Sequence, residues 1–186
     1  MSLGPIFTPA NQLTLLRMAL IPVFALLVIY GYMGAAIGVF VIAGLTDAFD
    51  GLLARRTGKT TLGAWLDPVA DKLLVATMFI VLTLPLPHLV APIPVWLTVL
   101  VLSRDIGIVA TVAIVNLAIE RRTFRPSIIG KVATATFLVT GVVTLMVNYV
   151  RDYTWAVPLF AYVSVALTVV SALHYARHAS RLSDGT

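Results

Sequence analysis

Residues 11–30 read NQLTLLRMALIPVFALLVIY, a run of mostly apolar side chains that holds one charged residue, Arg17. A helix of about 20 apolar residues is long enough to cross a hydrocarbon core roughly 30 Å thick. Similar runs recur through the 186 residues, of which 60% are hydrophobic and 11% charged, and the mean hydropathy is +1.00. A soluble domain of this size cannot bury so much apolar surface, so the composition predicts a polytopic membrane protein.

The apolar runs are separated by short connections rich in breaker residues, and they predict an all-α bundle of six transmembrane helices. The expected helices cover residues 11–30, 35–56, 61–84, 92–119, 127–148 and 155–176. No separate soluble domain is visible, so residues 1–186 are expected to form a single transmembrane domain. Basic residues gather at the second and fourth connections and after the last helix. Since cytoplasmic loops carry an excess of Lys and Arg, both termini are expected in the cytoplasm.

The net charge of +5 has two readings. A basic chain can bind nucleic acid, but a membrane protein acquires the same excess from its cytoplasmic loops, so no nucleic-acid partner is expected.

The chain has no cysteine, which excludes disulfides, thiolate metal sites and cysteine nucleophiles. Any chemistry must use other side chains.

Four aspartates lie around the second connection. Asp47 and Asp50 are three positions apart and Asp67 and Asp71 are four apart, so each pair occupies one face of its helix. A carboxylate at mid-bilayer costs about 2.5–3.5 kcal/mol on insertion scales, which makes these positions informative. Two helices joined by a short turn would bring the four carboxylates to one pocket, where their mutual repulsion calls for cations. Oxygen ligands suit hard divalent ions such as Mg²⁺.

Small residues and one arginine separate the two aspartate pairs. They are Gly51, Ala54, Arg55 and Gly63. The small side chains let a large group approach the backbone, and the planar donor fork of Arg55 suits a phosphate. The segment therefore predicts a metal-bound phosphate.

This pattern resembles the signature of the CDP-alcohol phosphatidyltransferase family. The residues that carry the resemblance are Asp47, Asp50, Gly51, Ala54, Arg55, Gly63, Asp67 and Asp71. The stretch between Arg55 and Gly63 is one residue shorter than in the common form of the signature. The segment from Pro9 to Arg17 is similar to the opening of bacterial members that use glycerol-type acceptors.

The resemblance implies an enzyme of phospholipid biosynthesis in a bacterial inner membrane, with its active site facing the cytoplasm. It would move a phosphatidyl group from CDP-diacylglycerol to glycerol 3-phosphate or phosphatidylglycerol and release CMP. Two divalent cations, Mg²⁺ or Mn²⁺, would be held by Asp47, Asp50 and Asp67 together with Asp71, which would also act as the base. Gly51, Ala54, Arg55 and Gly63 would line the nucleotide site. The family also implies a homodimer among membrane lipids.

Three basic residues in or at the ends of apolar segments are candidates to bind the acceptor: Arg104, Lys131 and Arg17. Snorkelling to the interface or an internal ion pair are the alternatives for each of them. A small cation or proton transporter is the competing function, because intramembrane carboxylates also mark ion pathways. The clustering of the aspartates on the side of the basic loops favours the enzyme. The intact set of four aspartates argues against a catalytically inactive relative.

Overall fold

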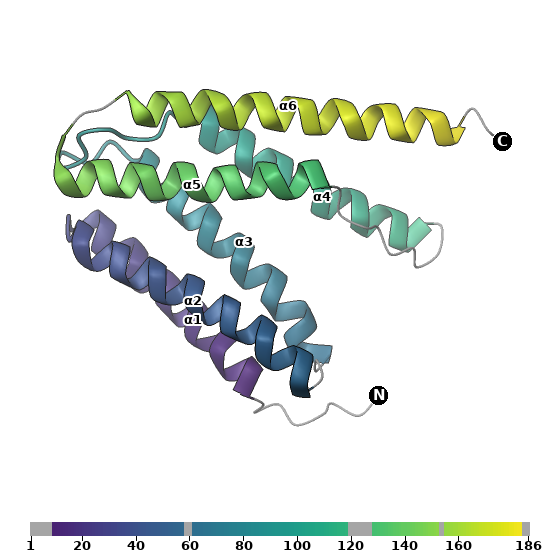
Figure 1. Cartoon of the computed structure of the whole chain (residues 1–186), viewed down its shortest axis with the longest axis horizontal. Helices are drawn as coiled ribbons and strands as arrows, with labels where there is room; N and C mark the ends of the chain where they lie inside the picture. The colour runs from purple at the N-terminus through teal and green to yellow at the C-terminus, as the bar shows by residue number, and fades with distance from the viewer. Residues whose placement is uncertain (1–8, 58–60, 119–127, 153–154, 184–186) are drawn as a thin grey trace.

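The computed structural model describes residues 9–57, 61–118, 128–152 and 155–183. Within these ranges the chain forms six α-helices and no strand, which confirms the predicted all-α class (Figure 1). The helices are α1 Pro9–Ile29, α2 Met33–Thr57, α3 Thr61–Thr83, α4 Val95–Ala118, α5 Ile128–Val150 and α6 Ala156–Ser183.

Eleven of the twelve predicted helix ends lie within three residues of the observed ones. The helix α4 begins at Val95 rather than at residue 92, because Pro92 and Pro94 disfavour helical backbone in the residues before them. The end of α6 was predicted wrongly, since this helix continues to Ser183 instead of ending near residue 176. Apolar periodicity stops at that point, but neither glycine nor proline occurs before Gly185, so nothing in the local sequence breaks the helix.

Among the described residues, two helices contain a stretch long and apolar enough to cross a membrane: Gln12–Ile29 in α1 and Val132–Val150 in α5. The apolar parts of α2 and α6, Met33–Thr46 and Ala156–Val170, are shorter. Many large apolar side chains face outward, among them Leu26, Val99 and Val170, each at least half exposed. Exposed apolar surface of this extent is expected where lipid replaces water as the solvent. The six-span topology stays a prediction.

The helix α1 packs against both α2 and α3, and α5 packs along α6, while α3 also contacts α4 and α5 (Figure 1). Buried aromatic rings join these groups. The rings of Phe24 and Phe40 lie 5.7 Å apart between α1 and α2, and those of Phe79 and Phe137 meet edge to face at 6.0 Å between α3 and α5. The position of α3 beside α1 sets the geometry of the site described below.

Polar contacts hold the end of the bundle where α1 finishes and α2 begins. The buried amide of Asn148 in α5 accepts from the backbone N–H of Ala91 and donates to its carbonyl, both at 3.0 Å. The ring of His88 makes a 2.8 Å hydrogen bond with the carbonyl of Val28. Gly31 lies against this ring with φ of +82°, a conformation that glycine adopts at no steric cost. The connection between α3 and α4 is therefore tied to α1 and α5.

Candidate active site

The signature residues lie on two helices around one connection. Asp47 and Asp50 belong to the second half of α2, and Asp67 and Asp71 to the first half of α3. The structure gives helical backbone for the remaining signature positions, and their side chains lie outside the described residues together with those of Asp47 and Asp50. These positions are Gly51, Ala54, Arg55 and Gly63. The site is therefore built from the side chains that α3 presents to its neighbours.

Asp67 and Asp71 both contact α1. The hydroxyl of Thr14 donates a 2.7 Å hydrogen bond to Oδ1 of Asp67. One turn further along α1, Nη1 of Arg17 donates to Oδ1 of Asp71 in an ion pair. Because Thr14 and Arg17 are three positions apart and the aspartates four apart, one turn of α1 faces one turn of α3. The two helices are thus joined by two polar contacts in register.

The ion pair connects the interior of the bundle with its surface. Arg17 is completely buried, and the side chain of Asp71 keeps 48% of its area exposed. A buried guanidinium without an anion would be strongly unfavourable, so Asp71 stabilises a cation inside the apolar segment of α1. Sequence reasoning left an internal ion pair open for Arg17, and the structure shows one.

A second charged group links α3 with α4 and α5. Nζ of Lys72 lies 3.3 Å from Oδ2 of Asp105, and Nη1 of Arg104 lies 3.0 Å from Oδ1 of the same carboxylate. Arg104 also donates to the hydroxyl of Thr134 at 3.4 Å, and its guanidinium sits 5.6 Å from the centre of the Phe137 ring. Adjacent helical residues point in different directions, so Lys72 joins this group while Asp71 faces α1.

Of the three acceptor candidates, the structure thus describes the side chains of Arg17 and Arg104. The two belong to separate polar groups, one on each flank of α3. Lys131 lies in the first turn of α5, three positions before Thr134, and its side chain is outside the described residues.

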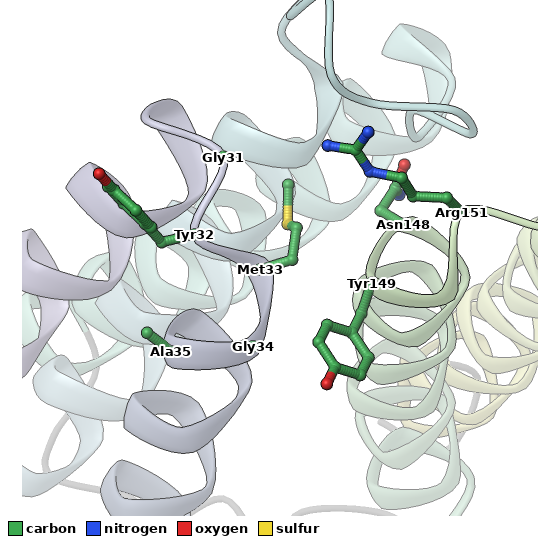
Figure 2. Close-up of a pocket in the computed structure, with 8 residues that line it drawn as sticks. All are labelled: Gly31, Tyr32, Met33, Gly34, Ala35, Asn148, Tyr149 and Arg151. Atoms are coloured by element: carbon green, nitrogen blue, oxygen red, sulfur yellow. The ribbon is translucent and has the colours of Figure 1, made fainter.

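A groove of about 310 Å³ lies near the start of α2, whereas Asp47 and Asp50 lie in the second half of this helix. Figure 2 shows the residues that line the groove. Its lining comes from the connection between α1 and α2, the start of α2, the end of α5 and the residue that follows α5. The lining residues are Gly31, Tyr32, Met33, Gly34, Ala35, Asn148, Tyr149 and Arg151. This lining contains a cation but no carboxylate, so the groove is separate from the candidate active site.

The donor atoms at the aspartates fit a divalent cation. Asp67 and Asp71 supply carboxylate oxygens on one face of α3, and hard cations such as Mg²⁺ and Mn²⁺ prefer oxygen ligands. Among the side chains that the structure describes, no three His, Cys, Asp or Glu residues gather in one place. Those of Asp47 and Asp50 are not among them.

Residues 7–172 match the CDP-alcohol phosphatidyltransferase family, so the chain belongs to this family and is an enzyme of that class. The chain is 36% identical over 170 residues to a probable phosphatidylglycerophosphate synthase of Mycobacterium tuberculosis strain H37Rv, covering 88% of this chain and 72% of the relative. It is 32% identical to the human CMP-forming cardiolipin synthase over an alignment of 204 positions, covering 94% of this chain and 66% of the relative.

A third relative is the CDP-diacylglycerol–glycerol-3-phosphate 3-phosphatidyltransferase of Escherichia coli strain K12. It is 46% identical over 82 residues, which are 41% of this chain and 44% of the relative. These names agree with the phospholipid biosynthesis that the signature predicted. Family membership and the two long apolar helices together support a membrane protein.

Proposed function

We propose that the enzyme transfers a phosphatidyl group from CDP-diacylglycerol to a hydroxyl of a glycerol-type acceptor, with release of CMP. The observation that carries this proposal is the intact aspartate signature, two of whose carboxylates face one turn of α1. The acceptor is glycerol 3-phosphate or phosphatidylglycerol. Relatives with each of the two corresponding names cover most of the chain, and this supports both acceptors about equally.

Asp47, Asp50 and Asp67 would hold two divalent cations, Mg²⁺ or Mn²⁺, together with Asp71. When bound, such ions polarise the phosphoryl group and stabilise the negative charge on the leaving CMP. Gly51, Ala54 and Gly63 would leave room for the nucleotide, and the guanidinium of Arg55 would neutralise phosphate charge. The oxygen-only donor set on α3 supports this assignment.

Asp71 would act as the general base. It takes the proton of the acceptor hydroxyl as the acceptor oxygen forms its bond to phosphorus, and the bond from phosphorus to the CMP oxygen breaks. An in-line displacement of this kind needs no covalent enzyme intermediate. The half-exposed carboxylate of Asp71 supports the role, because a base must be accessible to its substrate.

Arg104 and Lys131 would bind the acceptor phosphate. Arg104 is held in place by Asp105, Thr134 and the ring of Phe137, and a guanidinium in a fixed position suits a phosphate. Arg17 is the weaker candidate for acceptor contact, since its guanidinium is buried and engaged by Asp71.

We further propose a single domain of six transmembrane helices with both termini in the cytoplasm, working as a homodimer in a bacterial inner membrane. The basic residues at the second and fourth connections and after the last helix support this orientation, and the aspartates lie around the second connection. The active site would then face the cytoplasm.

The proposal is tested by supplying the purified protein with labelled CDP-diacylglycerol, Mg²⁺ or Mn²⁺ and a panel of alcohols. The panel contains glycerol 3-phosphate, phosphatidylglycerol, inositol phosphate and serine. The expected product is phosphatidylglycerophosphate or cardiolipin, with CMP released in equal amount. A preference for inositol phosphate or serine, or turnover that persists in excess chelator, would contradict the proposal.

A further inference from the structure

We propose that Thr14 and Arg17 are positioning residues, which set the orientation of Asp67 and Asp71 from the neighbouring helix α1. This inference rests on the proposed roles of the two aspartates. It assigns a function to Thr14, which the signature does not include. It also gives Arg17 a task other than contact with the acceptor.

The contacts are specific in register and in chemistry. Thr14 donates to Oδ1 of Asp67 at 2.7 Å, and Arg17 donates to Oδ1 of Asp71. The terminal torsion of an aspartate is broad, so a carboxylate without a fixed partner samples many orientations. A donor held rigidly on a second helix selects one of them. Partners of this kind, which orient a ligand without touching the metal or substrate, are typical of metal sites.

The contacting residues of α1 and α3 differ in how much of their surface is exposed. Thr14 and Arg17 are both 0% exposed, whereas the side chain of Asp71 keeps 48% of its area exposed. Thr14 and Arg17 therefore contact the carboxylates from the interior of the bundle. The surface that a metal ion or a substrate can reach is on the α3 residue Asp71. A completely buried guanidinium that already donates to Asp71 is poorly placed to bind the phosphate of an incoming alcohol.

The positive charge of Arg17 has a second effect, on the net charge beside the aspartates. A guanidinium stays protonated at any working pH, so Arg17 permanently offsets one negative charge beside the aspartates. Lys72 on α3, whose side chain the structure also describes, lies 3.3 Å from Asp105 and belongs to the polar group that joins α4. Loss of the Arg17 charge therefore removes a repulsion toward a divalent cation and, in the same variant, the partner that orients Asp71. These two effects on metal affinity oppose each other, so the readout for Arg17 is kcat.

The first experiment compares Thr14→Val with Thr14→Ser and measures Mn²⁺ affinity by electron paramagnetic resonance of the purified protein in lipid nanodiscs. Valine keeps the shape but lacks the hydroxyl, and serine keeps the hydroxyl. Thr14→Val is expected to weaken Mn²⁺ binding about 10–100-fold, the range for lost outer-shell partners, and Thr14→Ser to stay near wild type. The control is Thr144→Val, which removes a buried hydroxyl that donates within α5.

The second experiment measures kcat and the acceptor KM for Arg17→Lys and Arg17→Met, with Arg151→Met as the control at an exposed cation. Arg17→Met is expected to lower kcat about 10–100-fold with the acceptor KM changed less than twofold, and Arg17→Lys to recover part of kcat.

Two results would overturn the inference. One is a rise in the acceptor KM of Arg17→Met with kcat retained, which is the behaviour of an acceptor ligand. The other is equal Mn²⁺ affinity in Thr14→Val and Thr14→Ser, and this comparison decides the matter if Arg17→Met fails to fold. A wild-type protein that binds Mn²⁺ but uses no glycerol-type alcohol would contradict the proposed function alone, because the Thr14 comparison needs no turnover. Wild-type protein that binds no Mn²⁺ would overturn both.

Discussion

The ion pair between Arg17 and Asp71 makes the replacement Asp71→Asn a test of both stability and chemistry. Asparagine keeps the size of the side chain and an acceptor oxygen, but it removes the negative charge that faces a completely buried guanidinium. Breaking a fully buried pair costs about 3–5 kcal/mol. Since the side chain of Asp71 is 48% exposed, water screens part of this loss and the smaller value for a charged hydrogen bond, about 1.5–3 kcal/mol, applies.

For a chain of this size each kcal/mol moves the midpoint of thermal unfolding by roughly 2–4 °C, so Asp71→Asn is expected to lower it by roughly 3–12 °C. Transfer to the acceptor is expected to be lost, because asparagine cannot take a proton, while CDP-diacylglycerol still binds. The assay combines thermal unfolding followed by tryptophan fluorescence, binding of labelled CDP-diacylglycerol, and turnover. The exposed aspartate replacement Asp152→Asn is the control and is expected to change none of the three.

A double-mutant cycle separates the pair from other effects of the substitution. In Arg17→Met combined with Asp71→Asn no buried charge is left without a partner, so the double variant is expected to be more stable than the sum of the single losses predicts. Additive losses would refute the view that Asp71 stabilises the Arg17 cation. Full transfer by Asp71→Asn across the pH range would refute its role as the base.

Three further predictions concern other parts of the molecule. Replacing any one of the other three signature aspartates by asparagine is expected to weaken Mn²⁺ binding and abolish turnover, and wild-type activity in any of them would contradict its role as a ligand. Arg104→Ala or Lys131→Ala is expected to raise the acceptor KM far more than the KM for CDP-diacylglycerol, and unchanged acceptor kinetics in both would refute this placement. Asn148→Ala removes the side-chain amide that hydrogen-bonds to the backbone N–H and C=O of Ala91. It is therefore expected to lower the free energy of unfolding by about 2–4 kcal/mol, measured by thermal unfolding. The activity of folded Asn148→Ala is expected to stay near wild type because the site lies at the other end of the bundle, and Tyr149→Phe is the control.

The sequence alone determined the helices and the signature of this protein, because both are local properties. A run such as residues 11–30 is helical in a membrane since every backbone N–H and C=O must find a partner within its own segment. The spacing of Asp67 and Asp71 places both on one face of α3 whatever surrounds them. The end of α6 was not predicted because the helix continues beyond its last apolar residues. A polar helical segment lacks the apolar periodicity from which helices are predicted.

Only the tertiary structure decided which partners these residues have. Thr14 and Asp67 are 53 positions apart, Arg17 and Asp71 are 54 apart, and Asn148 and Ala91 are 57 apart. Each contact depends on which helices are neighbours and on the rotation of each about its axis, and neither quantity follows from periodicity within one segment. The spacing of Thr14 and Arg17 showed that they share a face of α1, but only the packing of α1 on α3 determined that this face meets the aspartates.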